Sequence, residues 1–457
     1  MEIILKAIQL VLSLSLLVIV HEFGHFLFAR LFKMRVDKFY LFFNPSFSLV
    51  RAKKIDGKWK FSFLSSAAPE AWKAHAENTE FGIGWVPLGG YCKISGMIDE
   101  SMDKEQLKQA PQPWEFRTKP AWQRFFVMIG GVLFNLLLAI LIYSGILFTW
   151  GERYMANEDV AYGYKVNELA HELGFRDADK IIAFDGQAIE RAEEVLLELI
   201  HRQAKTATVV RTADTVTIAI DHQYLPALVQ QRNMFTPITP FIVEAIPDTS
   251  HNAQAGLLAG DCIAAIDDKK ITSSEDASGI FEEKKSTTVH ATVRRDTATL
   301  LIPLQVNADG KIGVLLRQPL HITVKTYSLP ASFPAGVRKG YKTVKGYLHE
   351  LKFIFTPKTE GYKSVGSFIT IGKIFPGNWN WLAFWNITAF LSIMLAVLNI
   401  LPIPGLDGGH TLFVLYEMVT RRKPSDKFLE YTTTAGLIFL LAIMVLAFGN
   451  DIFRLFK

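Results

Sequence analysis

Cysteine is scarce in this sequence, and no long run of one charge occurs in it. Only Cys92 and Cys262 are found among 457 residues, and a pair so far apart gives no disulfide framework. Lysine and arginine number 49 against 44 aspartate and glutamate residues, which leaves a net charge of +5 without a basic cluster. Nucleic acid is therefore not an expected partner. The first apolar run lacks the basic leader and small-residue cleavage site of a secretory signal, so we expect it to remain in the mature chain.

Long apolar segments, by contrast, are abundant. Half of the residues are hydrophobic, and the mean hydropathy is +0.20. A helix needs about 20 mostly apolar residues to cross the hydrocarbon core of a membrane. Four segments reach this length: residues 7–28, 125–150, 382–406 and 431–450. The sequence therefore predicts a polytopic α-helical membrane protein with four transmembrane helices.

Basic residues in the short loops predict the topology, because lysine and arginine are retained on the cytoplasmic side. The loop after the first span carries Lys33, Arg35, Lys38, Arg51, Lys53 and Lys54. The loop between the third and fourth spans carries Arg421, Arg422, Lys423 and Lys427. We place both loops in the cytoplasm. By alternation, both termini and the stretch from about 151 to 380 lie on the opposite side.

The stretch between the second and third spans contains an internal repeat. Its glycine, aspartate and isoleucine positions recur after a shift of 82 residues; the pairs are Gly174 and Gly256, Asp179 and Asp261, Ile181 and Ile263, Asp185 and Asp267, and Ile189 and Ile271. Each copy is predicted to be a small β domain. The pattern resembles tandem PDZ domains, which bind extended peptides along a sheet edge. Spacers that bind no ligand remain the alternative.

The first predicted span contains the pattern H-E-x-x-H at His21, Glu22 and His25. On a helix, a spacing of four residues places both imidazoles on one face, which is an arrangement of metal ligands. Ionisable side chains in a membrane helix are costly unless they are paired or ligated, so their presence indicates a functional site. The alternative is that the span ends at Val20 and that the three polar residues lie at the membrane surface.

A catalytic zinc site commonly has three protein ligands and one open position, so a third ligand is needed. Asp407 is the best candidate, because it lies at the end of the third span in the segment NILPIPGLDGGH. Pro402 and Pro404 should break the helix there, and the glycines after Asp407 allow close approach of the backbone. Such irregular backbone is tolerated at membrane depth only inside protein or along a wet cavity. His410 competes as a ligand, although a non-ligating position nearby suits it better.

These residues predict a mechanism with one zinc ion. His21, His25 and Asp407 would hold the ion, which activates a water molecule and polarises the scissile carbonyl. Glu22 would take the proton of the water and pass it to the leaving amine. Asn135 is a polar group in the apolar second span and needs a hydrogen-bond partner there. We expect its role to be structural rather than catalytic.

Taken together, HEFGH in the first span, LDGGH at the end of the third span and the repeat between the second and third spans resemble the RseP-type site-2 proteases. These are bacterial intramembrane zinc metalloproteases of peptidase family M50. Two further stretches carry the resemblance, EFGIGWVPLGGYCKI at residues 80–94 and PWEFRTKPAWQR at residues 113–124. The resemblance covers nearly the whole chain.

The resemblance implies an enzyme of regulated intramembrane proteolysis. Its substrates would be transmembrane segments of single-pass proteins, such as anti-sigma factors already cut by a site-1 protease in an envelope stress response, and remnant signal peptides. The enzyme would lie in the lipid bilayer of the bacterial inner membrane. The PDZ pair and both termini would be periplasmic, and the active site would lie near the cytoplasmic face. The PDZ pair would exclude bulky, uncut substrates.

The resemblance also implies where a substrate binds. Residues 86–94 would form a β-hairpin that dips into the membrane beside the zinc and offers an edge strand to an unwound substrate. The residues expected to contact the substrate are Asn399, Pro402, Val86, Leu88, Gly89, Gly90 and Tyr91. Residues 341–375 would supply amphipathic helices on the membrane surface.

The chain is thus expected to contain eight successive segments. The first three are the first transmembrane helix with HExxH (1–30), a cytoplasmic and membrane-reentrant β region (31–124) and the second transmembrane helix (125–150). The next three are two PDZ domains (151–235 and 236–325) and amphipathic surface helices (326–380). The last two are the third transmembrane segment with LDGG (381–420), and a cytoplasmic loop with the fourth transmembrane helix (421–457).

Two other functions fit parts of the sequence. A membrane-anchored PDZ scaffold or chaperone without catalysis would not need zinc. A metal transporter would also place histidine and aspartate in the membrane. Transporters commonly show internal symmetry among their spans, however, and the four segments here are dissimilar.

Overall fold

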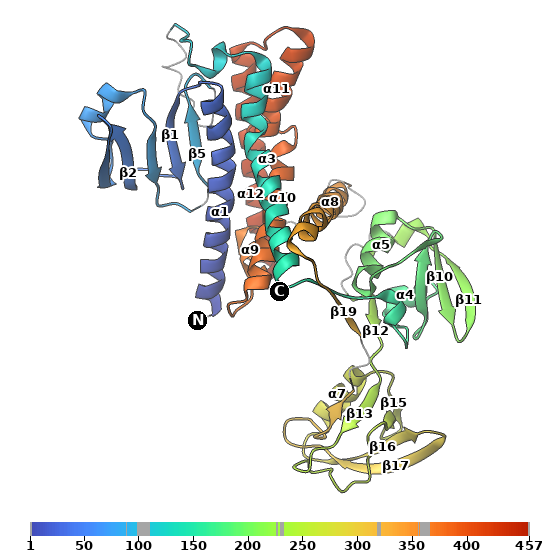
Figure 1. Cartoon of the computed structure of the whole chain (residues 1–457). Helices are drawn as coiled ribbons and strands as arrows, with labels where there is room; N and C mark the ends of the chain where they lie inside the picture. Colours follow the sequence, from blue (N-terminus) through green and yellow to red (C-terminus); the bar gives the residue numbers. More distant parts are fainter. Residues whose placement is uncertain are drawn as a thin grey trace. The chain divides into compact units, whose positions relative to one another are not determined.

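A computed structural model describes residues 2–87, 89–97, 110–224, 227–228, 233–317, 321–354, 356 and 366–455 of the chain. The chain divides into two compact units. One unit combines Met1–Gly151 with Thr326–Lys457, and the other is Glu152–Lys325. The first unit holds the long helices and one sheet, and the second holds shorter helices and several sheets (Figure 1).

The first unit contains four helices that, among the described residues, are long and apolar enough to cross a membrane. They are α1 (Glu2–Leu31), α3 (Ala121–Thr149), α10 (Trp381–Ile400) and α12 (Asp426–Leu455). Each overlaps one of the four predicted spans, and α3 packs against both α1 and α10. The prediction of a helical membrane protein is therefore confirmed.

The buried face of α1 explains how this helix packs. Its buried residues recur at intervals of about four, as on one face of a helix; they are Gln9, Ser13, Leu17, His21, Gly24, His25 and Ala29. Small and polar side chains allow helices in a membrane to approach closely. At Gly24, a Cβ would lie 2.3 Å from the carbonyl oxygen of Gly130 in α3. The two backbones are therefore in contact, and His21 and His25 face the inside of the helix bundle.

The helix α3 begins at Ala121, earlier than the predicted span at residue 125, because the charge in its first turn has a partner. Arg124 is buried, and its Nη2 lies 2.5 Å from Oε1 of Glu417 in α11 (Asp407–Thr420). A buried cation is tolerated when it is paired in this way. The apolar run alone therefore underestimates the length of the helix.

The third predicted span is broken as its prolines predict. The helix α10 ends at Ile400, and α11 begins at Asp407. A Cβ at Gly408 would lie 2.2 Å from the carbonyl oxygen of Leu401, so only glycine fits there. This close approach folds the chain back after the break and places Asp407 at the start of α11.

Two further helices lie in the stretch 326–380, for which the sequence predicts amphipathic helices. They are α8 (Leu329–Ile354) and α9 (Phe368–Ile374). The helix α8 packs against α3 and α10, and it exposes apolar side chains that include Phe333 and Tyr341. Helices are thus present in this stretch, and their position on the membrane surface stays a prediction. Residues 357–365, between the two helices, lie outside the described residues.

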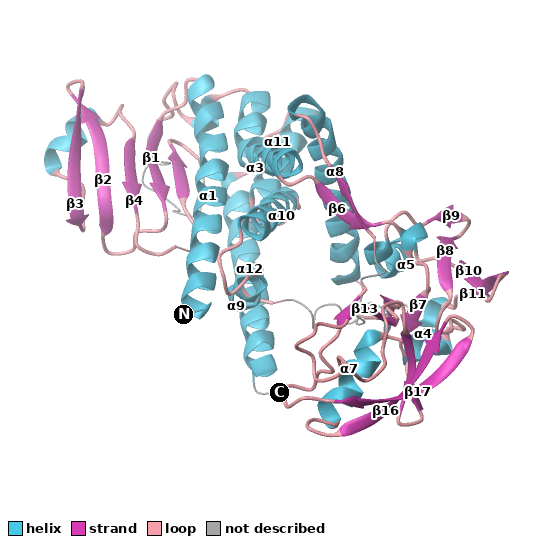
Figure 2. Cartoon of the chain, turned by 60° about the horizontal axis from the view of Figure 1, so that its bottom comes forward, coloured by secondary structure: helices cyan, strands magenta, loops and turns pink. Residues whose placement is uncertain are grey.

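A five-stranded sheet lies beside α1 (Figures 1 and 2). In the order β3-β2-β4-β1-β5, its strands are β3 (Lys58–Ser65), β2 (Ser48–Ile55), β4 (Glu80–Ile83), β1 (Val36–Leu41) and β5 (Tyr91–Ile94). Two 3-10 helices belong to the same region, η1 (Glu70–His75) and η2 (Phe116–Thr118). The strand β1 pairs with β4 in parallel and with β5 in antiparallel orientation. The hairpin predicted for residues 86–94 is wrong: among the described residues of this range only Tyr91–Ile94 form a strand, β5, which pairs with β1, and Val86 bridges Phe43.

Buried polar residues hold this sheet together. In β2, Nη1 of Arg51 donates to Oε1 of Glu80 at 2.8 Å, and the hydroxyl of Tyr40 donates to the same oxygen at 2.5 Å. All three residues are buried. The ring of Tyr40 also stacks on Tyr91 of β5, with ring centroids 5.1 Å apart. These contacts fix β5 as the edge strand nearest α1.

The unit Glu152–Lys325 contains two β-rich parts, one for each copy of the repeat (Figure 1). The first contains η3 (Asn157–Asp159), β7 (Tyr164–Val166), α4 (Glu168–Glu172), β8 (Lys180–Phe184), β9 (Gln187–Ala188), η4 (Ala192–Glu194), α5 (Val195–Arg202), β10 (Thr206–Arg211), β11 (Asp214–Ala219), η5 (His222–Tyr224) and β12 (Phe235–Pro237). The second contains β13 (Phe241–Ala245), β14 (Cys262–Ile266), β15 (Lys269–Lys270), α7 (Ser274–Glu283), β16 (Thr288–Arg295), β17 (Ala298–Gln305) and β18 (Leu315–Leu316). Its core includes Val243, Ile266, Val289 and Val293.

The pairing of strands moves one predicted boundary. The strand β12 pairs with β7 of the first part, so this part continues past residue 235, where the sequence predicts its end. The ends of the unit also pair with each other, β6 (Glu152–Met155) with β19 (Ile322–Lys325). Strands so far apart in the sequence can pair without any local sequence pattern that predicts the pairing.

The repeated aspartates have the same role in both parts. The carboxylate of Asp179 accepts hydrogen bonds from Arg211, and that of Asp261 accepts them from Arg295. Both aspartates are fully buried. Since a buried carboxylate needs a charged partner, this pair explains why the aspartate recurs in the sequence.

Candidate metal centre

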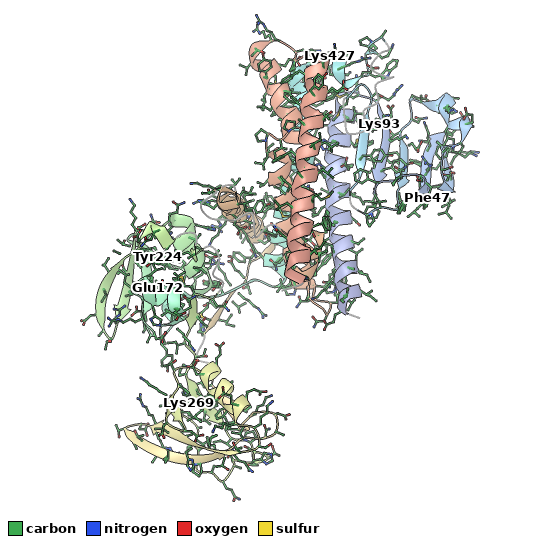
Figure 3. The ribbon with its side chains drawn as sticks, turned by 180° about the vertical axis from the view of Figure 1, so that it is seen from behind. Phe47, Lys93, Glu172, Tyr224, Lys269 and Lys427 are labelled. Carbon is green, nitrogen blue, oxygen red and sulfur yellow. The ribbon has the colours of Figure 1, made fainter. Side chains whose placement is uncertain are left out.

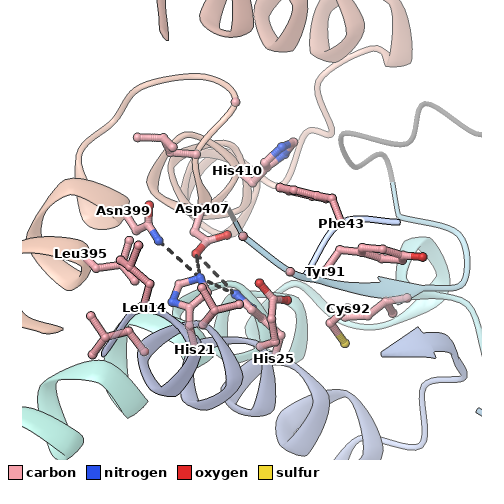
Figure 4. Close-up of a pocket in the computed structure, with 18 of the residues that line it drawn as sticks. Leu14, His21, His25, Phe43, Tyr91, Cys92, Leu395, Asn399, Asp407 and His410 are labelled. Atoms are coloured by element: carbon pink, nitrogen blue, oxygen red, sulfur yellow. Dashed lines mark hydrogen bonds and ion pairs between the residues drawn. The ribbon is translucent and has the colours of Figure 1, made fainter. Parts of the chain in front are cut away.

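His21 and His25 of α1 meet Asp407 of α11 inside the first unit (Figure 4). Nε2 of His21 lies 3.1 Å from Oδ2 of Asp407, and Nε2 of His25 lies 3.4 Å from the same oxygen. The two Nε2 atoms are 3.2 Å apart. Within the described part of the chain, this is the group of side chains that could hold a metal ion. The structure thus brings the three predicted ligands together.

Local structure explains how each ligand is presented. His21 and His25 are one helical turn apart on the buried face of α1. Asp407 is the first residue of α11, where a carboxylate is favoured by the positive end of the helix dipole. The break between α10 and α11 supplies the turn that brings this helix end to α1.

The distances within the cluster fit a zinc ion. Two ligand atoms that are each about 2.0–2.1 Å from zinc in a tetrahedral site lie about 3.3–3.4 Å apart, close to the three separations observed. In addition, Oδ2 of Asp407 is buried and makes no hydrogen bond of acceptable geometry with the described residues. A buried carboxylate oxygen needs a positive partner. Two imidazoles and a carboxylate are also a common donor set for catalytic zinc.

Both imidazoles turn Nδ1 toward α3. Nδ1 of His25 lies 2.8 Å from the carbonyl oxygen of Val127. A carbonyl oxygen only accepts, so His25 carries a proton on Nδ1, and its Nε2 is left to ligate. Nδ1 of His21 lies 3.2 Å from the amide of Asn135, which provides the polar partner that Asn135 needs in this span.

A cavity of about 570 Å³ opens on the cluster (Figure 4). Glu22 of α1 and Asn399 at the end of α10 line it. So do Gly89 and Gly90, just before β5, and Tyr91 and Cys92 at the start of β5. Nδ2 of Asn399 lies 3.3 Å from Nε2 of His21. The cavity has the size of a ligand-binding pocket, and it combines the three candidate ligands with the candidate base.

The remaining residues that were candidates for the site differ in where they lie. Val86 does not line this cavity, and its N–H donates to the carbonyl oxygen of Phe43 at 3.1 Å. Pro402 is exposed in the segment after α10 and does not line the cavity either. His410 lines the cavity but is not part of the three-residue cluster. Leu88 lies outside the described residues.

Gly131 contributes to the site, although it is not among the site residues predicted from the sequence. A Cβ at this position of α3 would lie 2.5 Å from Cε1 of His21 and 2.6 Å from Nε2 of His25. The adjacent glycines 130 and 131 in an apolar helix were an available signal, since small residues mark close contacts between membrane helices.

The fold and the site define a class of protein, a membrane protein whose helices enclose a candidate zinc centre. Comparison with known families gives the same answer: the model of peptidase family M50 matches residues 9–68 and 57–443. The chain belongs to peptidase family M50.

Relatives in several bacteria match along most or all of their length. A protein of Xylella fastidiosa strain Temecula1 is 27% identical over 468 residues, with 97% of each chain covered. A protein of Rickettsia conorii is 24% identical over 462 residues, and the match covers 99% of this chain and 100% of the relative. A protein of Vibrio cholerae is 24% identical with the same coverage. Their names describe them provisionally as zinc metalloproteases. The chain is accordingly a membrane zinc metalloprotease, and its resemblance to the site-2 proteases is confirmed at the level of the family.

Proposed function

We propose that the protein is an intramembrane endopeptidase, which cleaves peptide bonds within transmembrane segments of single-pass membrane proteins. One observation carries the proposal. His21 and His25 belong to α1, a helix apolar enough to span a membrane, and their side chains face Asp407 on the buried side of this helix. A scissile bond that reaches these residues has to enter the layer of membrane helices.

The residues that line the cavity have different roles in the proposed reaction. His21, His25 and Asp407 would hold one zinc ion, which when bound supplies a Lewis acid that activates water and polarises the scissile carbonyl. Glu22 directly follows His21 and lines the same cavity. Its carboxylate can take a proton from the attacking water and deliver that proton to the leaving amine nitrogen. The amide of Asn399, beside His21, can donate a hydrogen bond to a backbone carbonyl of the substrate.

The position of β5 supports binding of an unwound substrate. A transmembrane helix has its backbone groups hydrogen-bonded internally, so a segment must unwind before one of its peptide bonds can be attacked. The strand β5 is at one edge of the five-stranded sheet, and its residues Tyr91 and Cys92 line the cavity. An extended segment can add to such an edge as a further strand.

Basic residues support an orientation with the active site near the cytoplasm. Nζ of Lys423, in the loop between α11 and α12, donates to the carbonyl oxygen of Arg117, just before α3. Lys427 lies at this end of the helical unit (Figure 3). Since basic residues are retained on the cytoplasmic side, we place the protein in a bacterial inner membrane with both termini and the unit Glu152–Lys325 in the periplasm.

We also propose that the two β-rich parts of Glu152–Lys325 are PDZ domains that select substrates. Their repeat and their equivalent buried aspartate–arginine pairs support a common fold for the two. In this role they would exclude intact proteins and admit those whose external domain a site-1 protease has removed. Anti-sigma factors cut in this way, and remnant signal peptides, are the substrate class that we propose.

The test is cleavage of a single-span substrate by the purified full-length protein in detergent, with the cut located by mass spectrometry. Glu22→Gln should lower the rate by at least about 10²-fold, the typical contribution of a general base, while zinc stays bound. Glu168→Gln, an exposed position in α4, is the matched control and should leave the rate unchanged.

Two outcomes would overturn the proposal. Undiminished cleavage by Glu22→Gln would exclude the assigned mechanism, and cuts that fall only outside the membrane segment would exclude intramembrane cleavage. A scaffold without catalysis predicts a third pattern, in which the substrate binds but stays uncut at every zinc concentration.

A further inference from the structure

The helix α3 supplies a hydrogen-bond partner to each imidazole of the candidate zinc site. Nδ1 of His25 faces the carbonyl oxygen of Val127 at 2.8 Å, and Nδ1 of His21 faces the side-chain amide of Asn135 at 3.2 Å. Neither partner is a candidate metal ligand. Both belong to a helix to which the proposed chemistry assigns no ligand or base.

The side chain of Asn135 has an acceptor atom that is not used. Its relative exposure is 0%, and its Oδ1 has no hydrogen-bond partner among the described residues. The oxygen and nitrogen of a side-chain amide have nearly the same shape, so the two orientations are distinguished by their hydrogen bonds. Either Nδ2 or Oδ1 of the amide can therefore face His21.

Zinc binding requires one of the two orientations. If Nδ2 donates to Nδ1 of His21, a neutral imidazole carries its proton on Nε2, and Nε2 cannot ligate. If Oδ1 faces His21 instead, Nδ1 carries the proton and donates it to the amide oxygen. Nε2 then has a free lone pair, and Nε2 is the atom that faces Asp407 and His25.

We propose that Asn135 is a positioning residue of the metal centre. Its Oδ1 accepts the hydrogen bond from Nδ1–H of His21 and so holds the tautomer and ring orientation that zinc needs. The inference rests on the proposed function, because it requires zinc to be held by His21, His25 and Asp407. Metal-ligating histidines almost always donate their other N–H to an acceptor such as a carboxylate or a carbonyl. Here an amide oxygen of the second membrane helix takes that role.

Asn135 is itself fixed by a neighbouring helix. Its backbone carbonyl accepts a hydrogen bond from Oγ of Ser392 in α10 at 2.8 Å. Ser392 is also fully buried, and α10 leads through the break to Asp407. One residue of α3 therefore contacts a ligand of α1 and the helix that precedes the third ligand, which keeps the three ligands in a constant arrangement.

Three variants of the full-length protein test this role. Asn135→Leu removes the acceptor at similar volume, and Asn135→Asp keeps an acceptor as a carboxylate. Asn386→Leu is the matched control, because it removes another amide from a membrane helix, one that donates to Leu382 of its own helix at 2.9 Å. Zinc affinity is measured by competition with a chromogenic chelator. Substitution with Co²⁺ gives visible absorption bands that report the coordination geometry.

We expect Asn135→Leu to weaken zinc binding by about 10–100-fold, the usual effect of losing such a partner, and to change the Co²⁺ bands. Asn135→Asp should bind zinc at least as tightly as the wild type, because a carboxylate also accepts from Nδ1–H. Asn386→Leu should match the wild type in both measurements.

Wild-type affinity and bands in Asn135→Leu, or an equal loss in Asn135→Leu and Asn135→Asp, overturn the inference; the second result would indicate a packing role. If Asn135→Leu does not fold, Asn135→Asp decides alone: zinc binding within tenfold of the wild type supports the role, and a greater loss overturns it. A wild-type protein that binds no zinc would overturn the proposed function itself, whereas unchanged binding in Asn135→Leu would remove only the role of Asn135.

Discussion

Gly131 of α3 lies so close to His25 of α1 that a Cβ at position 131 would be 2.6 Å from Nε2 of the imidazole. The same Cβ would be 2.5 Å from Cε1 of His21. Both imidazoles thus pack directly against Gly131, and a methyl group at this position would displace them.

Gly131→Ala should therefore impair the metal centre. Alanine favours a helix by about 1 kcal/mol over glycine, so any loss must come from the displaced imidazoles. We expect zinc affinity and kcat each to fall by at least about tenfold, since small displacements of reacting groups are costly. Gly145→Ala is the control in the same helix, because a Cβ at Gly145 has no neighbour within 4 Å. Equal activity of the two variants would contradict the close contact.

Removal of zinc should abolish cleavage and lower stability. Binding at a free zinc concentration 100 times the dissociation constant stabilises the folded state by about 2.7 kcal/mol. We expect a chelator to stop cleavage and to lower the temperature of unfolding of the helical unit. Zinc should restore both, and Mg²⁺ should not, because Mg²⁺ prefers oxygen ligands. Full cleavage after exhaustive chelation would exclude a zinc enzyme.

Asp451 of α12 should anchor the short helix α9. Its carboxylate accepts hydrogen bonds from N and Oγ of Ser367 and from N and Oγ1 of Thr370. Asp451 is buried, so Asp451→Ala leaves buried donors unpaired at a cost of about 1–3 kcal/mol. We expect faster amide exchange across Phe368–Ile374 by hydrogen-exchange mass spectrometry.

A second variant of α12 controls for general effects on that helix. Thr434→Val removes a hydroxyl that, among the described residues, donates to Glu430 of its own helix, and it should leave exchange in α9 unchanged. Since Phe368 lines the cavity, Asp451→Ala should also change kcat/KM, whereas Thr434→Val should not. Unchanged exchange in Asp451→Ala would show that α9 is held by other contacts.

The second β-rich part should lose stability in acid. Hydrogen bonds from Arg295 hold the pKa of the Asp261 carboxyl below its usual range. A group whose pKa is lowered by folding stabilises the folded state above its unfolded pKa, about 3.9 for aspartate, and this contribution is lost as the pH falls through the folded value. We expect protection of β16 amides to fall below about pH 4, after correction for intrinsic exchange rates.

Arg295→Ala should lower the stability of the second β-rich part already at neutral pH. It leaves the buried carboxylate of Asp261 without its charged partner, so we expect the free energy of unfolding of this part to fall. Arg294→Ala, at the exposed neighbouring position, should have little effect. Equal stability of the two variants would show that the pair contributes nothing.

Features that depend on neighbours in the chain could be predicted from the sequence. The four membrane helices follow from apolar length, because the bilayer sets one requirement for every span. The facing of His21 and His25 follows from a helical spacing of four residues. The break before Asp407 follows from Pro402 and Pro404, which cannot continue a helix.

Features that join distant segments could not be predicted. The strand β5 pairs with β1, and Val86 bridges Phe43, so the described residues of 86–94 do not form the hairpin that their closeness in sequence suggests. The partner of Arg124 is Glu417, 293 residues away, and the apolar run alone predicts a start of α3 that is too late in the sequence. Neither of these contacts can be predicted from the order of residues along the chain.

The sequence by itself determined that this is a helical membrane protein with an H-E-x-x-H zinc motif and a broken third span, because bilayer thickness and helical geometry act locally. Only the tertiary structure decided how the ligands meet and what holds them. Three ligands from two helices converge at 3.1–3.4 Å, and Asn135 reaches His21 from a third helix. Such positions depend on how side chains from separate helices pack against one another, and no local rule specifies that packing.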